Sequence, residues 1–176
     1  AMTDYVLENW KKYLREDHEA EEAADGQAAG FIILSNNDDV LLVRRSDGDS
    51  LGQLAGTGGT MEAGEGPFQT ATRETMEEVG RNFGGLDPME EEPHVHEKPG
   101  LVFTTYLMGS MNNFPCELNL EHDAWGWIDI DDINHAINNR GGELTSNKFY
   151  DRSGKPTEVK AKIHDGVINA IMNFKL

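Results

Sequence analysis

The feature that most constrains this chain is a glycine-rich stretch that leads directly into a short acidic helix. Residues 46–66 contain seven glycines, which predicts a loop. Pro67 stands where a helix would begin and Gly80 where it would end, so a helix of about three turns is expected over Phe68 to Val79. The fold therefore has to keep this loop and this helix adjacent in space.

Helical geometry places three carboxylates of this helix on one side. At about 100° per residue, Glu74, Glu77 and Glu78 share an arc of about 100°, away from the apolar face. Clustered carboxylates repel one another unless a cation compensates, and oxygen ligands of this kind suit Mg²⁺ or Mn²⁺. Arg73 is placed to orient a carboxylate, and the glycines at 56–59 let the backbone approach a metal or phosphate. This combination indicates hydrolysis of a phosphoanhydride.

The same segment resembles the Nudix box, which spans Gly59 to Arg81 here. Seven fixed positions carry the resemblance: Gly59, Glu65, Arg73, Glu74, Glu77, Glu78 and Gly80. Thr57, Thr75 and Arg81 depart from the usual pattern, at positions that concern packing more than chemistry. The resemblance implies an α/β protein, a Nudix-like α/β/α sandwich with a mixed central sheet.

The resemblance also implies a metal site. Glu77 and Glu78 resemble the principal ligands, with the Gly58 carbonyl nearby. Glu74 and, in a later loop, Glu121 resemble further carboxylates that bind metal in many members. The implied cofactor is Mg²⁺, with Mn²⁺ as a substitute.

Catalytic roles follow from the same resemblance. Glu74 resembles the residue that deprotonates the attacking water, Arg73 resembles its orienting partner, and Glu121 is the other candidate base. The implied reaction is hydrolysis of a nucleoside diphosphate linked to another group, by attack of activated water on phosphorus.

Apolar periodicity divides the rest of the chain into short elements. Helices are expected over residues 4–24, 131–138 and 158–174, and strands over 28–35, 40–45, 101–111 and 124–130. Residues 81–99 and 139–157 are expected to be loops. We therefore expect an N-terminal helical extension over residues 1–25 and a Nudix hydrolase domain over residues 26–176.

The amino-acid composition limits the classes of molecule that this chain can bind. The chain has 15 basic against 32 acidic residues and a formal charge of −17, which disfavours nucleic acid and anionic membrane surfaces. We expect no membrane span and no signal peptide. The single Cys116 excludes an internal disulfide and fits a reducing, cytoplasmic compartment. The expected partner is a small nucleotide, and the N-terminal helix could mediate a homodimer.

Three rival interpretations stay open: a catalytically inactive Nudix-fold module that binds a nucleotide, an acidic interaction protein, and a prenyl-diphosphate isomerase. The complete set of box acids favours the hydrolase. Among substrates, the Glu121-His122 pair ahead of an aromatic-rich strand resembles members that act on nucleoside triphosphates or on nucleotides in general. Residues 91–100 lack the Tyr that marks the dinucleoside-polyphosphate subgroup.

Seven side chains outside the box are also functional candidates. They are a phosphate contact (Arg44 or Arg45), a base-stacking wall (Trp125 and Trp127), a metal-binding pair (His94 and His96) and a base or supporting group (His122). For the first three we favour ordinary structural roles, namely strand-end charge, core packing and exposed polar side chains.

Overall fold

The structure is a computed structural model that describes residues 4–20, 26–80 and 85–176. Its helices are α1 (Asp4–Ala20), α2 (Pro67–Val79), α3 (Ile130–Asn139) and α4 (Asp165–Phe174). Its strands are β1 (Gln27–Ser35), β2 (Asp39–Arg45), β3 (Leu54–Ala55), β4 (Thr57–Thr60), β5 (Leu86–Pro88), β6 (His94–Lys98), β7 (Leu101–Ser110), β8 (His122–Asp129), β9 (Glu143–Asp151) and β10 (Pro156–Lys162). None of the helices in these ranges is long and apolar enough to cross a membrane.

The strands in the described ranges form one mixed sheet of ten strands. Its main order is β10-β9-β8-β2-β1-β7-β5, and the short strands β3, β4 and β6 pair with β2, β1 and β7. β1 and β7 run parallel at the centre, with Gln27 beside Val102. The pairs β1–β2, β2–β8, β8–β9 and β9–β10 are antiparallel. A parallel pair requires a long connection, and α2 lies within the segment that joins β1 to β7.

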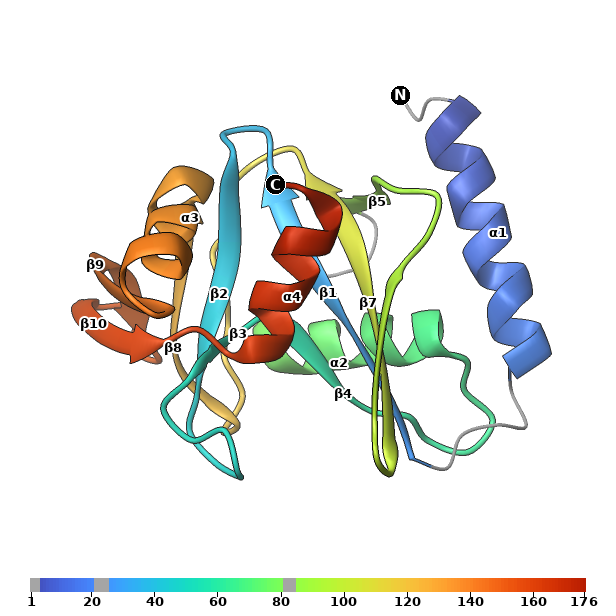
Figure 1. Ribbon diagram of the computed structural model, residues 1–176, viewed down its shortest axis with the longest axis horizontal. Helices are drawn as coiled ribbons and strands as arrows, with labels where there is room; N and C mark the ends of the chain where they lie inside the picture. The colour runs from blue at the N-terminus through green and yellow to red at the C-terminus, as the bar shows by residue number, and fades with distance from the viewer. Residues whose placement is uncertain (1–3, 21–25, 81–84) are drawn as a thin grey trace.

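Helices cover both faces of this sheet (Figure 1), so its central strands are buried on both sides. One core lies between the sheet and α3 and α4, where Ile133 and Ile171 pack against β-strand side chains such as Leu42. The other lies under α1 and α2, where Phe68 packs against Phe31. The predicted α/β/α sandwich with a mixed central sheet is therefore confirmed.

The N-terminal helix α1 contributes directly to the second core. Tyr13 is fully buried, and its ring meets those of Phe68 and Tyr106 at centroid distances of 5.2 and 4.6 Å. Its hydroxyl donates to the carbonyl of Glu90. Trp10 packs edge-on against Phe68, 5.3 Å away. Because Phe68 belongs to the first turn of α2, α1 steadies the start of that helix. The last residues of the expected extension, 21–25, lie outside the described ranges.

The expected long C-terminal helix is wrong in its first half. Residues 156–162 form the strand β10, and α4 begins only at Asp165. Val159, Ala161 and Ile163 alternate with polar residues, which is the strand period, and all three are buried. The apparent helical stripe arose because Val159 and Ile163 are four apart, a spacing that fits one helical turn and also two strand repeats.

Other expected loops also contain strands. Residues 46–66 include β3 and β4, residues 81–99 include β5 and β6, and residues 139–157 include β9. These strands are short, glycine-rich or largely exposed, so they lack the apolar alternation that predicts a strand from sequence. Their pairing with β1, β2, β7 and β8 defines them instead. The other predicted helices and strands are confirmed within the described ranges.

We predict that Tyr13→Ala lowers the free energy of unfolding by about 3 to 5 kcal/mol, because a fully buried aromatic ring is lost and leaves a cavity. Urea denaturation measures the change. Leu14→Ala, on the same helix but 52% exposed, is the control and should cost less than about 1 kcal/mol. Equal stabilities of the two variants would contradict the packing described for α1.

Candidate active site

Helix α2 is fixed at both ends by the residues that the sequence predicts. Pro67 occupies the first turn, and the Gln69 side chain accepts a hydrogen bond from the backbone N–H of Gly66 at 3.1 Å. Gly80 ends the helix with φ of 69°, in the left-handed region that favours glycine. The expected helix over 68–79 is therefore confirmed, and its side chains project from a well-defined support.

Arg73 lies at the centre of a network of carboxylates. Its guanidinium contacts Glu65 twice, from Nε to Oε2 at 2.8 Å and from Nη2 to Oε1 at 3.0 Å. Nη1 donates to Glu74 Oε1 at 3.0 Å and to Glu77 Oε2 at 3.2 Å. Nη2 also donates to the carbonyl of Thr60 at 3.1 Å, which ties α2 to β4. These bonds fix the planar guanidinium, which in turn orients the carboxylates.

The network gives its carboxylates different proton affinities. Hydrogen bonds from Arg73 lower the pKa of Glu65, which is therefore a fixed anion. Burial raises the pKa of Glu74 despite the nearby Arg73. The Glu74 carboxylate lies against Gly59, where a Cβ atom would come within 2.4 Å of the carboxyl carbon. Gly59 thus leaves the space that this carboxylate occupies.

Glu78 is fully buried, although helical geometry places it away from the apolar face of α2. Its Oε1 accepts a hydrogen bond from the backbone N–H of Gly58 at 2.7 Å. β4 can bring this N–H so close because Gly58 faces Gly30 of β1, where a Cβ would lie 2.0 Å from the Thr57 carbonyl oxygen. Burial raises the pKa of Glu78 to about 9. A metal-free Glu78 therefore carries a proton at neutral pH.

A β-bulge brings His122 to Glu78. Arg44 pairs with Ala124 while Arg45 pairs with His122, so Asp123 is the extra residue on β8. The extra residue shifts the alternation of side chains and turns His122 toward α2. Its Nε2 lies 3.4 Å from Glu78 Oε2, and burial lowers the pKa of His122 to about 4, so the ring is neutral.

Glu78, Glu121 and His122 form a group that can hold a metal ion. One ligand atom from each lies within 4.8 Å of the others. Among the described residues, neither Glu78 Oε2 nor the ring nitrogens of His122 have a hydrogen-bond partner. Buried polar atoms normally have partners, and a divalent cation would satisfy an oxygen and a nitrogen placed in this way. The residues present therefore fit the divalent metal that the resemblance to the Nudix box implies.

Of the other candidates, Arg45 lies beside this group: it is the β2 partner of His122, and its charge acts on both Glu78 and His122. The remaining candidates have other surroundings. Trp125 and Trp127 are 8% and 7% exposed in the core beneath α2, as expected. Arg44 pairs with Asp123 at 2.6 Å. His94 and His96 stack on β6, with ring centroids 6.5 Å apart. The sequence indicates His122 only as a base or supporting group, because nothing in the sequence signals a bulge or complete burial.

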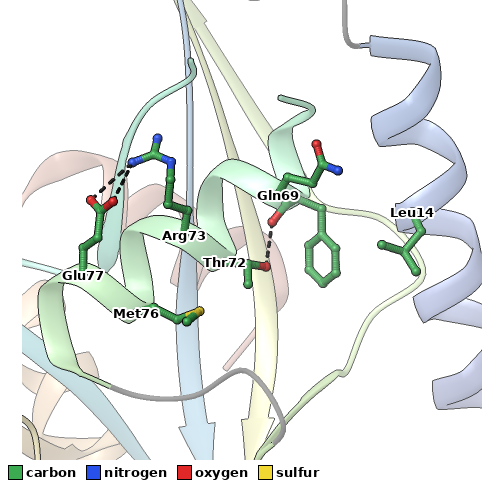
Figure 2. A pocket seen from close by; sticks show the side chains of 7 residues that line it. Leu14, Gln69, Thr72, Arg73, Met76 and Glu77 are labelled. Atoms are coloured by element: carbon green, nitrogen blue, oxygen red, sulfur yellow. Dashed lines mark hydrogen bonds and ion pairs between the residues drawn. The ribbon is translucent and has the colours of Figure 1, made fainter. Parts of the chain in front are cut away.

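An apolar groove lies on the opposite side of α2 (Figure 2). Leu14 of α1 faces Thr72 and Met76 across it, while Arg73 and Glu77 lie at its far end. Residues 69, 72 and 76 are about half a turn of the helix away from Glu78. The groove is therefore distinct from the acidic group.

A family model described as NUDIX domain matches residues 25–151, well over half of the sequence. The chain belongs to the Nudix family. Pig (Sus scrofa) bis(5'-nucleosyl)-tetraphosphatase [asymmetrical] is 37% identical over 81 residues, covering 42% of this chain and 54% of the pig protein. The match thus spans about half the length of that curated Nudix relative.

Solved structures agree on the fold. An Ap4A hydrolase binary complex from C. elegans has a TM-score of 0.55 at 25% identity, covering 65% of this Nudix chain and 89% of that chain. A NUDIX hydrolase from Nitrosomonas europaea has a TM-score of 0.53 at 17% identity, covering 86% and 88%. The Nudix hydrolase RenU from M. smegmatis has a TM-score of 0.54 at 21% identity, covering 62% and 74%. The last two show the Nudix fold alone.

Two departures from the Nudix box compensate for each other. Thr75 donates to the carbonyl of Ala71 at 2.7 Å, and its Oγ1 lies 2.6 Å from Thr57 Oγ1. Because the Thr75 proton is already used, Thr57 is the donor of the shared hydrogen bond. Both hydroxyls are buried, so the pair joins β4 to α2 by a hydrogen bond.

We predict that Thr75→Val costs about 1 to 3 kcal/mol, because it leaves the buried Thr57 hydroxyl without an acceptor. Thr57→Val should cost less, since Thr75 keeps its bond to Ala71. The double variant should recover much of the loss. A double-mutant cycle measured by urea denaturation tests this, and strictly additive effects would contradict the coupling.

The metal-free protein should lose stability as pH rises through the neutral range. The pKa of Glu78 is about 9 when folded against an ordinary 4.5, so stability linked to its proton is present below pH 4.5 and lost toward pH 9. His122 acts oppositely, since its lowered pKa of about 4 favours the neutral ring, whose contribution is complete above pH 6.5. From pH 6.5 to 9 the Glu78 proton therefore sets the sign, at up to about 1.4 kcal/mol per pH unit.

Urea denaturation in chelator across this pH range measures the slope. Glu78→Gln should flatten it, because the amide does not titrate. Glu158→Gln, which removes an exposed carboxylate on β10, should retain it. A Glu78→Gln slope equal to that of the unmodified chain would show that Glu78 is ionised in the folded protein.

Proposed function

We propose that this chain is a metal-dependent pyrophosphohydrolase that cleaves a phosphoanhydride bond in a small nucleotide. The observation that carries the proposal is the group of Glu78, Glu121 and His122, in which Glu78 Oε2 and the ring nitrogens of His122 are buried without a hydrogen-bond partner among the described residues. Such a group is costly unless a cation occupies it. Its place at the Nudix helix of a Nudix family member supports the assignment.

We propose Mg²⁺ as the metal, with Mn²⁺ as a substitute. Glu78 and Glu121 would hold it, and Glu74, Glu77 and the Gly58 carbonyl are the other expected ligands. When bound, the cation neutralises charge on the phosphate oxygens and lowers the pKa of a coordinated water. The carboxylates present favour a hard cation of this kind.

Glu74 would then accept the proton of the attacking water, and Arg73 would orient Glu74. Arg73 donates to Glu74 Oε1, which fixes the direction of the carboxylate. Burial raises the pKa of Glu74, so it accepts a proton from water more readily than an ordinary glutamate. Glu121 is the second candidate for the base, because it is exposed and belongs to the same group as Glu78.

Two substrate classes are in view. The Glu121-His122 pair before an aromatic strand supports a nucleoside triphosphate. The pig relative is named as a bis(5'-nucleosyl)-tetraphosphatase, which supports a dinucleoside tetraphosphate as the second candidate. The inactive binding module is the rival function, and product analysis separates it from both.

We predict that Glu78→Gln lowers turnover by several orders of magnitude while the fold persists, because the metal loses a buried anionic ligand. The assay incubates the protein and Mg²⁺ with nucleoside triphosphates, dinucleoside polyphosphates, ADP-ribose and sugar nucleotides, and identifies the products. Glu158→Gln is the matched control. Tight nucleotide binding without any product, also with Mn²⁺, would replace the hydrolase by the binding module.

A further inference from the structure

The carbonyl groups of the segment that contains Glu121 and His122 converge on Ser46 and Arg152. Ser46, just after β2, donates its backbone N–H to the carbonyl of Glu121 at 2.8 Å. The Ser46 hydroxyl donates to the carbonyl of Leu120 at 2.6 Å. Converging carbonyl oxygens repel one another, so the turn needs more donors than Ser46 supplies.

Arg152 supplies those donors from the turn between β9 and β10. Its Nε lies 2.9 Å from the carbonyl oxygen of His122 and 3.4 Å from that of Asn119. Its Nη2 donates to the carbonyl of Leu120 at 3.0 Å and to the hydroxyl of Ser46 at 3.2 Å. One guanidinium therefore bridges three carbonyls of residues 119–122 and the serine that holds the same turn.

Hydrogen bonds fix the turn that carries Arg152. The neighbouring Asp151 Oδ1 accepts hydrogen bonds from the Ser153 N–H at 2.8 Å, the Ser153 hydroxyl at 2.6 Å and the Lys155 N–H at 3.0 Å. The Asp151 N–H donates to the carbonyl of Lys155 at 2.9 Å, and Asp151 pairs with Ala124 across β8 and β9. The turn that presents Arg152 is thus tied to β8, the strand that begins at His122.

We propose that Arg152 is a positioning residue that holds Glu121 and His122 in register with Glu78 by binding the carbonyls of their loop. The proposal rests on the proposed function of that group. Arg152 contacts the loop backbone rather than the acidic side chains, and it lies one residue beyond the segment that the family model matches. Lysine cannot replace it fully, because an ammonium group lacks the planar fork that spans several acceptors.

The test compares Arg152→Ala and Arg152→Lys with Arg140→Ala, which removes an exposed arginine at the end of α3. Hydrogen exchange of the amides of residues 119–122 reports on the loop alone. Titration with Mn²⁺ alone, followed by electron paramagnetic resonance, reports on the metal group. Steady-state kinetics separate kcat from KM, and guanidinium ion is added to the alanine variant as a chemical substitute.

We expect faster exchange at residues 119–122 and about 10- to 100-fold weaker Mn²⁺ binding in Arg152→Ala, as for other groups that orient metal ligands. We also expect kcat to fall more than KM rises, with partial recovery in guanidinium and an intermediate loss in Arg152→Lys. If Arg152→Ala does not fold, Arg152→Lys carries the same comparison.

The proposal would be overturned if Arg152→Ala had the same hydrogen exchange and the same Mn²⁺ affinity as Arg140→Ala. It would also be overturned if Arg152→Ala lowered only the melting temperature and left both exchange and Mn²⁺ affinity unchanged. These two measurements need no turnover. If the unmodified chain hydrolyses no nucleotide, the proposed function fails while the role of Arg152 is still decided.

Discussion

Burial of the Glu78 carboxylate is the constraint on which the site depends. A buried carboxylate must find donors, a cation or a proton, and Gly58 supplies a single N–H to one of its oxygens. That donor exists because two glycines let β4 lie against β1. The other oxygen faces His122, which the bulge in β8 turns inward. Sheet, bulge and helix thus converge on one side chain.

Most of the candidate site residues could be predicted from the Nudix box. What the box could not predict depends on contacts between segments far apart in the sequence. Arg73, Glu65 and Glu74 could be predicted because they lie on one helix and its lead-in, where spacing alone determines proximity. The burial of Glu78 could not, because it depends on strands far away in the chain. Arg152 meets the loop only through backbone carbonyls, and no residue pattern records such contacts.

The fold was predictable where one period dominated. β1, β2 and β7 have long apolar runs, and α2 has both of its end signals. β10 was not predictable, because the spacing of Val159 and Ile163 fits both the helical and the strand period. Pairing with β9 decides in favour of the strand. β6 is mostly exposed, so it depends on hydrogen bonds to β7 rather than on apolar burial.

The parallel pairing of β1 with β7 has a consequence for the order of folding. Gln27 can pair with Val102 only after the intervening hairpin, loop and helix have been synthesised. Pairings between residues so far apart in the sequence form slowly. An emerging chain that already displays the complete box still lacks β7, β8 and the loop before it. At the proposed metal site, Glu121 and His122 meet Glu78 only after β8 has joined the sheet, so a cation bound there would favour the last steps of assembly over the first.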